Sequence, residues 1–154
     1  MKVIIGSDHA GFEAKQRLAA FLRKMGHTLE DAGTEGKDPV DYPDFAVQVG
    51  RTVAEGDADR GVLICGTGIG MSITANKIAG VRAAMATDEM TAEMGRKHND
   101  ANVLCLGARV LTPERMENLI RIFMATAFEG GRHVDRVNKI KQLDQGKKVT
   151  DTEE

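Results

Sequence analysis

Residues 62–72 read Val-Leu-Ile-Cys-Gly-Thr-Gly-Ile-Gly-Met-Ser. The first four residues form the continuous apolar run of a buried strand, and the glycines that follow are typical of a tight turn into a helix. Glycines at such a turn allow backbone N–H groups to approach an anion closely at the positive end of the helix. The stretch therefore predicts an α/β fold whose chemistry lies at the ends of strands.

Strand-like and helix-like patterns alternate along the rest of the chain. Short apolar runs predict strands, and apolar residues at helical spacing predict helices between them. Such repeated units with short connections predict a mostly parallel sheet with helices on both faces. The expected strands are 2–6, 28–31, 62–65, 81–86 and 102–106, and the expected helices are about 14–25, 69–77, 112–128 and 134–143, with two more that begin near Pro43 and Glu89.

The composition limits the classes of function. A chain of 154 residues suits one domain, which we expect over 1–145 with a polar, disordered tail over 146–154. The net charge of −2 and the 4% aromatic content give no reason to expect nucleic acid or an anionic membrane as a partner. The chain has no apolar run of the roughly 18–20 residues that cross a bilayer, no signal peptide, and two distant cysteines. A cytoplasmic protein with reduced thiols is expected.

Cys65 closes the predicted strand at 62–65, where the field of the following helix favours a thiolate. Taken alone, the pattern favours an ordinary core residue at Cys65 over a catalytic one. The glycine turn could also hold a dinucleotide, because Asp88 lies about 20 residues further on. The spacing is GxGxG rather than GxGxxG, however, and no Gly-Lys-Ser/Thr follows as in a nucleotide P-loop.

Two further groups of polar residues point to a phosphorylated ligand. Asp8 and His9 follow the first strand, where they can bind sugar hydroxyls or a phosphate, although Asp8 could instead cap the next helix. Basic residues beside late loops can bind phosphate, or can simply complement helix dipoles. No metal site is expected, because no two histidines have helical i, i+4 spacing with carboxylates beside them. The late basic residues are Arg109, Arg132, His133 and Arg136.

Several motifs in order give the chain a family resemblance. They are Gly-Ser-Asp-His-Ala-Gly at 6–11, Asp-Tyr-Pro at 41–43, Ile-Cys-Gly-Thr-Gly-Ile-Gly at 64–70, Ala-Asn-Lys at 75–77, Arg-Lys-His-Asn-Asp-Ala-Asn at 96–102 and Glu-Gly-Gly-Arg-His at 129–133. Over residues 1 to about 145 the chain resembles type B ribose-5-phosphate isomerases and galactose-6-phosphate isomerase subunits. The resemblance implies a single-domain, Rossmann-like three-layer fold that acts on a sugar phosphate without a cofactor. It also implies a homodimer with active sites shared across the interface, which in some relatives pairs into a tetramer.

The resemblance also implies a role for each matching residue. Cys65 would move the proton between C2 and C1 through a cis-enediolate, whose negative oxygen the amides of the 66–70 turn would hold. His98 and Thr67 would open the sugar ring, and Asp8 would shuttle protons between sugar oxygens. The substrate-binding residues that it implies are His9, Tyr42, Gly66, Gly68, Gly70, Ser72, Asn99, Arg109, Arg132, His133 and Arg136; of these, the partner subunit would donate Asn99, together with the catalytic His98.

Three alternatives remain open at this point. One branch of the family uses a glutamate in the helix after the turn as base, but residue 74 is Thr and no Glu lies between Gly66 and Lys77. Ribose 5-phosphate is the default substrate, although allose, galactose and erythrose phosphates require the same proton transfer. A non-catalytic phosphosugar-binding subunit is the third alternative, and the presence of Cys65, Asp8 and His98 together argues against it.

Overall fold

Five parallel strands form the centre of the structure, a computed structural model that describes residues 1–149. They pair in the order β2-β1-β3-β5-β4. Every pairing is parallel, with Ser7 opposite Ile64 and Cys65 opposite Gly107, which confirms the predicted parallel sheet. The strands are β1 (Lys2–Ser7), β2 (Thr28–Asp31), β3 (Arg60–Cys65), β4 (Ala83–Met85) and β5 (Val103–Gly107).

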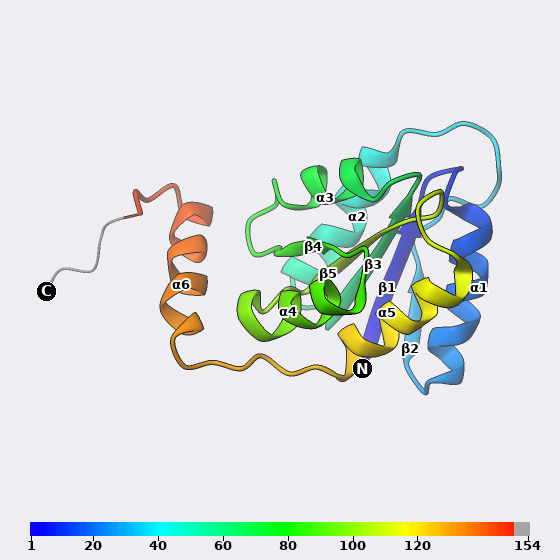
Figure 1. Cartoon of the computed structure of the whole chain (residues 1–154). Coiled ribbons are helices and arrows are strands. Elements are labelled where there is room, and N and C mark those ends of the chain that lie inside the picture. The colour runs from blue at the N-terminus through cyan, green and yellow to red at the C-terminus, as the bar shows by residue number, and fades with distance from the viewer. Residues whose placement is uncertain (150–154) are drawn as a thin grey trace, which may run out of the picture.

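Helices cover both faces of this sheet, because alternate residues of the strands point to opposite sides. Ile5 and Ile64 pack with α1 (Phe12–Lys24), α4 (Glu89–Asn99) and α5 (Pro113–Ala125) on one face. Ile4 and Leu63 pack with α2 (Tyr42–Ala54) and α3 (Ile69–Ala75) on the other face. The predicted three-layer fold is therefore confirmed, and α6 (His133–Asp144) lies beside the layers (Figure 1).

The segment between α5 and α6 connects the three layers to the last helix. Thr112 caps α5, since its Oγ1 accepts from the Arg115 amide at 3.3 Å. The helix ends at Ala125 rather than near Phe128, because Thr126 takes an extended conformation and donates its hydroxyl to the Ile122 carbonyl at 2.6 Å. The segment 126–132 then passes along α4, where the Glu129 amide donates to the Lys97 carbonyl at 3.1 Å, and leads to α6 (Figure 1).

The tail predicted over 146–154 extends beyond the described residues at 150–154. Within residues 1–149, no helix is long and apolar enough to span a bilayer.

The direction of the connections reverses between β1 and β3, and we use crevice as the name of this topological switch point at the carboxyl ends of the two strands. From β1 the chain moves outward to β2, and α2 then carries it back past β1 to β3. Connections that diverge from two neighbouring strands leave an opening at their carboxyl ends, where open α/β sheets bind ligands. The backbone amide of Asp8 donates to the Ile64 carbonyl at 3.2 Å, which brings Asp8 beside Cys65 at this crevice.

Candidate active site

Cys65 ends β3 at the crevice, with its side chain 5% exposed. The amide of Gly68 donates to its Sγ at 3.1 Å, so the glycine turn folds back over the sulfur. Gly68 has a φ of +83°, a conformation that favours glycine, and a Cβ there would lie 3.1 Å from the Leu106 carbonyl carbon. The turn thus places a hydrogen-bond donor on the one side chain in the motif that can act as a base.

The same turn packs directly on Gly107, the last residue of β5. A Cβ at Gly107 would lie 2.7 Å from the Thr67 carbonyl carbon and oxygen. Thr67 itself is exposed, and its Oγ1 accepts from the Ile69 amide at 3.2 Å. The neighbouring strand therefore fixes the height of the turn over Cys65.

We expect Gly107→Ala to destabilise the fold by about 1–3 kcal/mol, because the Thr67 backbone must move to admit the methyl group. The displaced turn should also lower the catalytic rate. Denaturant unfolding and initial rates measure the two effects. Gly36→Ala is the matched control, since a Cβ at Gly36 meets nothing within 4 Å; equal stability of the two variants would contradict this packing.

Asp8 and His9 directly follow the end of β1. The Asp8 carboxylate, 7% exposed, accepts from the Gly11 amide at 3.1 Å in the turn before α1. Gly11 is the N-cap of that helix and no side chain of the described residues caps it, so the capping role considered for Asp8 is not observed. His9 Nδ1 lies 3.2 Å from the Val40 amide nitrogen. Because a backbone N–H can only donate, this bond assigns the lone pair to Nδ1 and the proton of the neutral ring to Nε2. His9 can therefore donate Nε2–H to an anion.

Tyr42 and Arg109 flank the glycine turn. The Tyr42 ring lies over Gly70, where a Cβ would come within 2.6 Å of it, and the Arg109 guanidinium lies over Gly66, 3.3 Å from the corresponding Cβ position. Ser72 follows in α3 and is half-buried. We name this set the strand-end group: Asp8, His9, Tyr42, Cys65, the turn 66–70, Ser72 and Arg109.

The other predicted residues gather elsewhere, around a pocket of about 380 Å³. The rings of His98 and His133 stack there, with centroids 4.2 Å apart, and the Nε2 of each lies 3.9 Å from Glu129 Oε2. Burial, the neighbouring His98 and Arg132 lower the pKa of His133. With two arginines in its lining, the pocket suits an anion. We name these residues the helix-end group: His98, Asn99, Arg132, His133 and Arg136.

The two groups lie at opposite ends of the strands, one at the carboxyl ends and the other at the amino ends. The strand-end group follows the carboxyl ends of β1 and β3, whereas α4 runs back along the sheet and ends at the amino end of β5. There the Asn102 carbonyl accepts from Gly61 at the start of β3. The five residues of β5 separate its two ends by about 16 Å. The residues expected to form one site therefore do not meet within one chain.

His98, Glu129 and His133 form a cluster that the sequence did not reveal. Their potential ligand atoms all lie within 4.8 Å of one another, which makes them the metal-type group found among residues 1–149. The sequence pattern missed it because His98 comes from a different segment. The two imidazole rings are stacked on each other, and the two arginines in the same pocket repel a cation. The arrangement fits an anionic ligand better than a metal ion.

The packing gives structural roles to Asp88 and Cys105. Asp88 accepts from the Thr91 amide at 2.8 Å and caps α4 in a capping box, so it is not a ribose-binding acid. Cys105 is fully buried, and burial raises the pKa of its thiol, with the neighbouring Cys65 adding to the effect. Cys105 is thus a core residue, as its apolar neighbours predict.

Comparisons with known proteins agree with this fold. The chain matches the family described as Ribose/Galactose Isomerase over residues 3–140. It is 42% identical over 144 residues to ribose-5-phosphate isomerase B of Escherichia coli K12, covering 94% of this chain and 97% of that protein. The structure of Clostridium thermocellum ribose-5-phosphate isomerase B superposes with a TM-score of 0.93 at 46% identity, covering 95% of this chain and 99% of that one. The Mycoplasma genitalium enzyme, solved with bound ribulose 5-phosphate, gives a TM-score of 0.90 at 39% identity and covers 94% and 96%.

The parallel sheet covered by helices on both faces, together with these relatives, makes the chain a sugar-phosphate isomerase with a Rossmann-like fold. The chain belongs to the ribose/galactose isomerase family.

Proposed function

We propose that this chain interconverts ribose 5-phosphate and ribulose 5-phosphate, with Cys65 as the catalytic base. The observation that carries the proposal is the Cys65 sulfur at the crevice, 3.1 Å from the Gly68 amide. A donor at this distance stabilises a thiolate, and the thiolate is the form of cysteine that can accept a proton. The relatives of that name, which match nearly the full chain, support the choice of substrate.

The proposed reaction moves one proton between two neighbouring carbons. The Cys65 thiolate removes the proton from C2 of the open-chain aldose, and the electron pair of that bond forms the enediolate while C1–O becomes the negative oxygen. The amides of the turn 66–70 stabilise this oxygen, a contribution of about 3 kcal/mol for one donor. Asp8 carries the proton of the C2 hydroxyl to O1, and Cys65 returns its proton to C1 to give the ketose.

The remaining strand-end residues hold the substrate. His9 donates its Nε2–H to the phosphate, because the Val40 amide occupies Nδ1. Arg109, which lies over Gly66, adds a fixed positive charge at the same opening. Tyr42, above Gly70, and Ser72 contact the hydroxyls.

We propose that a second copy of the chain completes each site as a homodimer. The helix-end group lies at the other edge of its own sheet, so only a partner's copy can face Cys65. On α6 the exposed apolar side chains Val134, Ile140 and Leu143 offer a surface that a partner would cover. From the partner, His98 would open the ring with Thr67, Asn99 would bind a hydroxyl, and Arg132 and Arg136 would bind the phosphate with support from His133.

Two expectations from the sequence remain part of the proposal. Residues 1–145 form the isomerase domain. The protein works in the cytoplasm, where its two cysteines stay reduced; both are free and buried in the structure.

Proton NMR of ribose 5-phosphate in D₂O with the purified, chelator-treated protein tests the function. We expect ribulose 5-phosphate to appear with deuterium at the carbon beside the carbonyl, because the proton held by Cys65 can exchange with solvent. A sample without protein provides the enzyme-free baseline, and the Cys65→Ala variant shows the conversion that remains without the proposed base. Absence of conversion by the wild-type protein, together with conversion of a six-carbon or four-carbon aldose phosphate, would assign the chain to another substrate.

A further inference from the structure

The helix that carries His98 and Asn99 ends in an unusual turn. Asp100, the next residue, has a φ of 46° and a ψ of 44°, and it is the one residue other than glycine with positive φ among residues 1–149. This left-handed conformation costs of the order of 1 kcal/mol for such a residue. Contacts that reach Asp100 from outside α4 therefore determine where the end of the helix lies.

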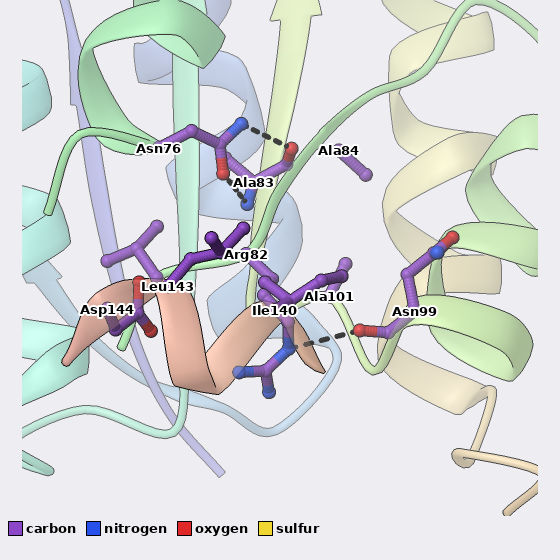
Figure 2. Close-up of a pocket in the computed structure, with 10 residues that line it drawn as sticks. Asn76, Arg82, Ala83, Ala84, Asn99, Ala101, Ile140, Leu143 and Asp144 are labelled. Atoms are coloured by element: carbon purple, nitrogen blue, oxygen red, sulfur yellow. Dashed lines mark hydrogen bonds between the residues drawn. The ribbon is translucent and has the colours of Figure 1, made fainter. Parts of the chain in front are cut away.

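Arg82, which precedes β4, supplies the first of these contacts. Its Nη2 donates to Asp100 Oδ2 at 3.2 Å, and its Nε lies 3.0 Å from the Asn99 carbonyl oxygen and 3.1 Å from that of Asp100. Figure 2 shows that the Asn99 side-chain amide points away from Arg82. Arg82 thus holds the backbone of Asn99 and leaves its side chain available for a ligand.

Arg96 supplies the second contact from one turn earlier in α4. It is 3% exposed, and its Nη1 donates to Asp100 Oδ1 at 2.9 Å and to the Ala101 carbonyl at 2.6 Å. Its Nε donates to the Thr126 carbonyl at 3.1 Å. Thr126 begins the segment that leads to Arg132 and His133, so one guanidinium joins both parts of the helix-end group.

We infer that Arg82, Arg96 and Asp100 form a positioning cluster, which sets His98 and Asn99 at the height required for ring opening. The inference rests on the proposed function. Two guanidinium groups share a single carboxylate here, with side-chain exposures of 12% and 3% for the two arginines. Removing ions from water in this way is a costly way to gain stability alone, whereas a planar guanidinium fixes geometry at several acceptors at once.

The cluster also lies where the two pockets of this region meet. The pocket in Figure 2, of about 440 Å³, includes Arg82 in its lining. It shares Asn99 and Ile140 with the pocket of the helix-end group. A change at Asp100 is therefore transmitted first to Asn99 and His98, and not to Cys65 at the other edge of the sheet.

Two variants at residue 100 distinguish the effect of the carboxylate from that of the left-handed backbone conformation. Asp100→Gly keeps the left-handed turn without strain and removes the carboxylate, whereas Asp100→Asn tolerates the same turn and keeps one oxygen acceptor. Glu93→Gln is the matched control, because it removes an ion pair with Lys97 on the same helix. Each variant is assayed for net conversion of ribose 5-phosphate, for exchange of the C1 proton of ribulose 5-phosphate in D₂O, and for thermal unfolding.

The two assays differ in their need for ring opening. Ribose 5-phosphate is mainly a furanose, whereas ribulose 5-phosphate cannot close to one because its C5 oxygen carries the phosphate. We expect Asp100→Gly to lower net conversion about 10–100-fold, as for a displaced catalytic group, and to lower C1 exchange much less. Asp100→Asn should recover part of the loss, and Glu93→Gln should match the wild type.

Two outcomes would overturn the inference while the proposed function stands. One is net conversion by Asp100→Gly equal to that of Glu93→Gln. The other is a parallel loss of conversion, exchange and thermal stability, which would make the cluster a structural anchor only. Failure of the wild-type protein to convert ribose 5-phosphate would instead contradict the proposed function, and this inference with it.

Discussion

Replacing Cys65 by alanine is expected to lower kcat for ribose 5-phosphate by about 10²–10⁴-fold, the usual contribution of a positioned general base. The loss should appear in kcat rather than KM, because the phosphate contacts of His9 and Arg109 remain. The fold should persist, since the substitution removes one sulfur atom at the rim of the core. Steady-state rates and circular dichroism of the pure variant measure both effects.

Cys105→Ala is the matched control for this prediction. Cys105 lies on the same face of the sheet as Cys65, but it is fully buried and burial keeps its thiol protonated near neutral pH. We expect this variant to keep its kcat while losing some stability to the small cavity. Iodoacetamide should inactivate the wild-type protein by alkylating Cys65 and not Cys105. Bound substrate should slow this alkylation. Full activity of Cys65→Ala would remove Cys65 from the mechanism.

The sequence predicted the sheet well because its signals are local. The apolar run that ends at Cys65 and the glycines after it specify a strand and a turn without help from distant residues. The end of α5 was wrong for the opposite reason. Nothing in the sequence near Phe128 indicates a stop at Ala125, which depends on the Thr126 hydroxyl and on the Arg96 guanidinium from another helix.

The sequence predicted the individual site residues, but it did not predict that they lie at the two opposite ends of the strands. His98 ends a helix that returns to the amino edge of the sheet, as helices in parallel α/β units do, so the direction of α4 already separates it from Cys65. The family resemblance supplied the shared site that reconciles this separation. Asp100 stands in the motif at 96–102, but its pairing with Arg82 was not predicted, because an arginine and an acid that meet through tertiary packing leave no pattern in the sequence.

Mixing two inactive variants is expected to restore activity if each site takes residues from both subunits. Cys65→Ala and His98→Ala each damage every site of their own homodimer. In a mixed dimer, however, one site receives both changes and the other receives neither. Half of randomly paired dimers are mixed, so subunit exchange or co-expression should give about one quarter of wild-type activity.

The matched control pairs Cys65→Ala with Asp8→Ala, since both residues belong to the strand-end group of one chain. Every site in that mixed dimer carries one of the two changes, and activity should stay at the level of the separate variants. Recovery in the first mixture and not in the second assigns His98 to the partner's half of the site. Equal behaviour of the two mixtures would contradict the shared site. In that case His98 would have to reach Cys65 of its own chain, past a strand of about 16 Å.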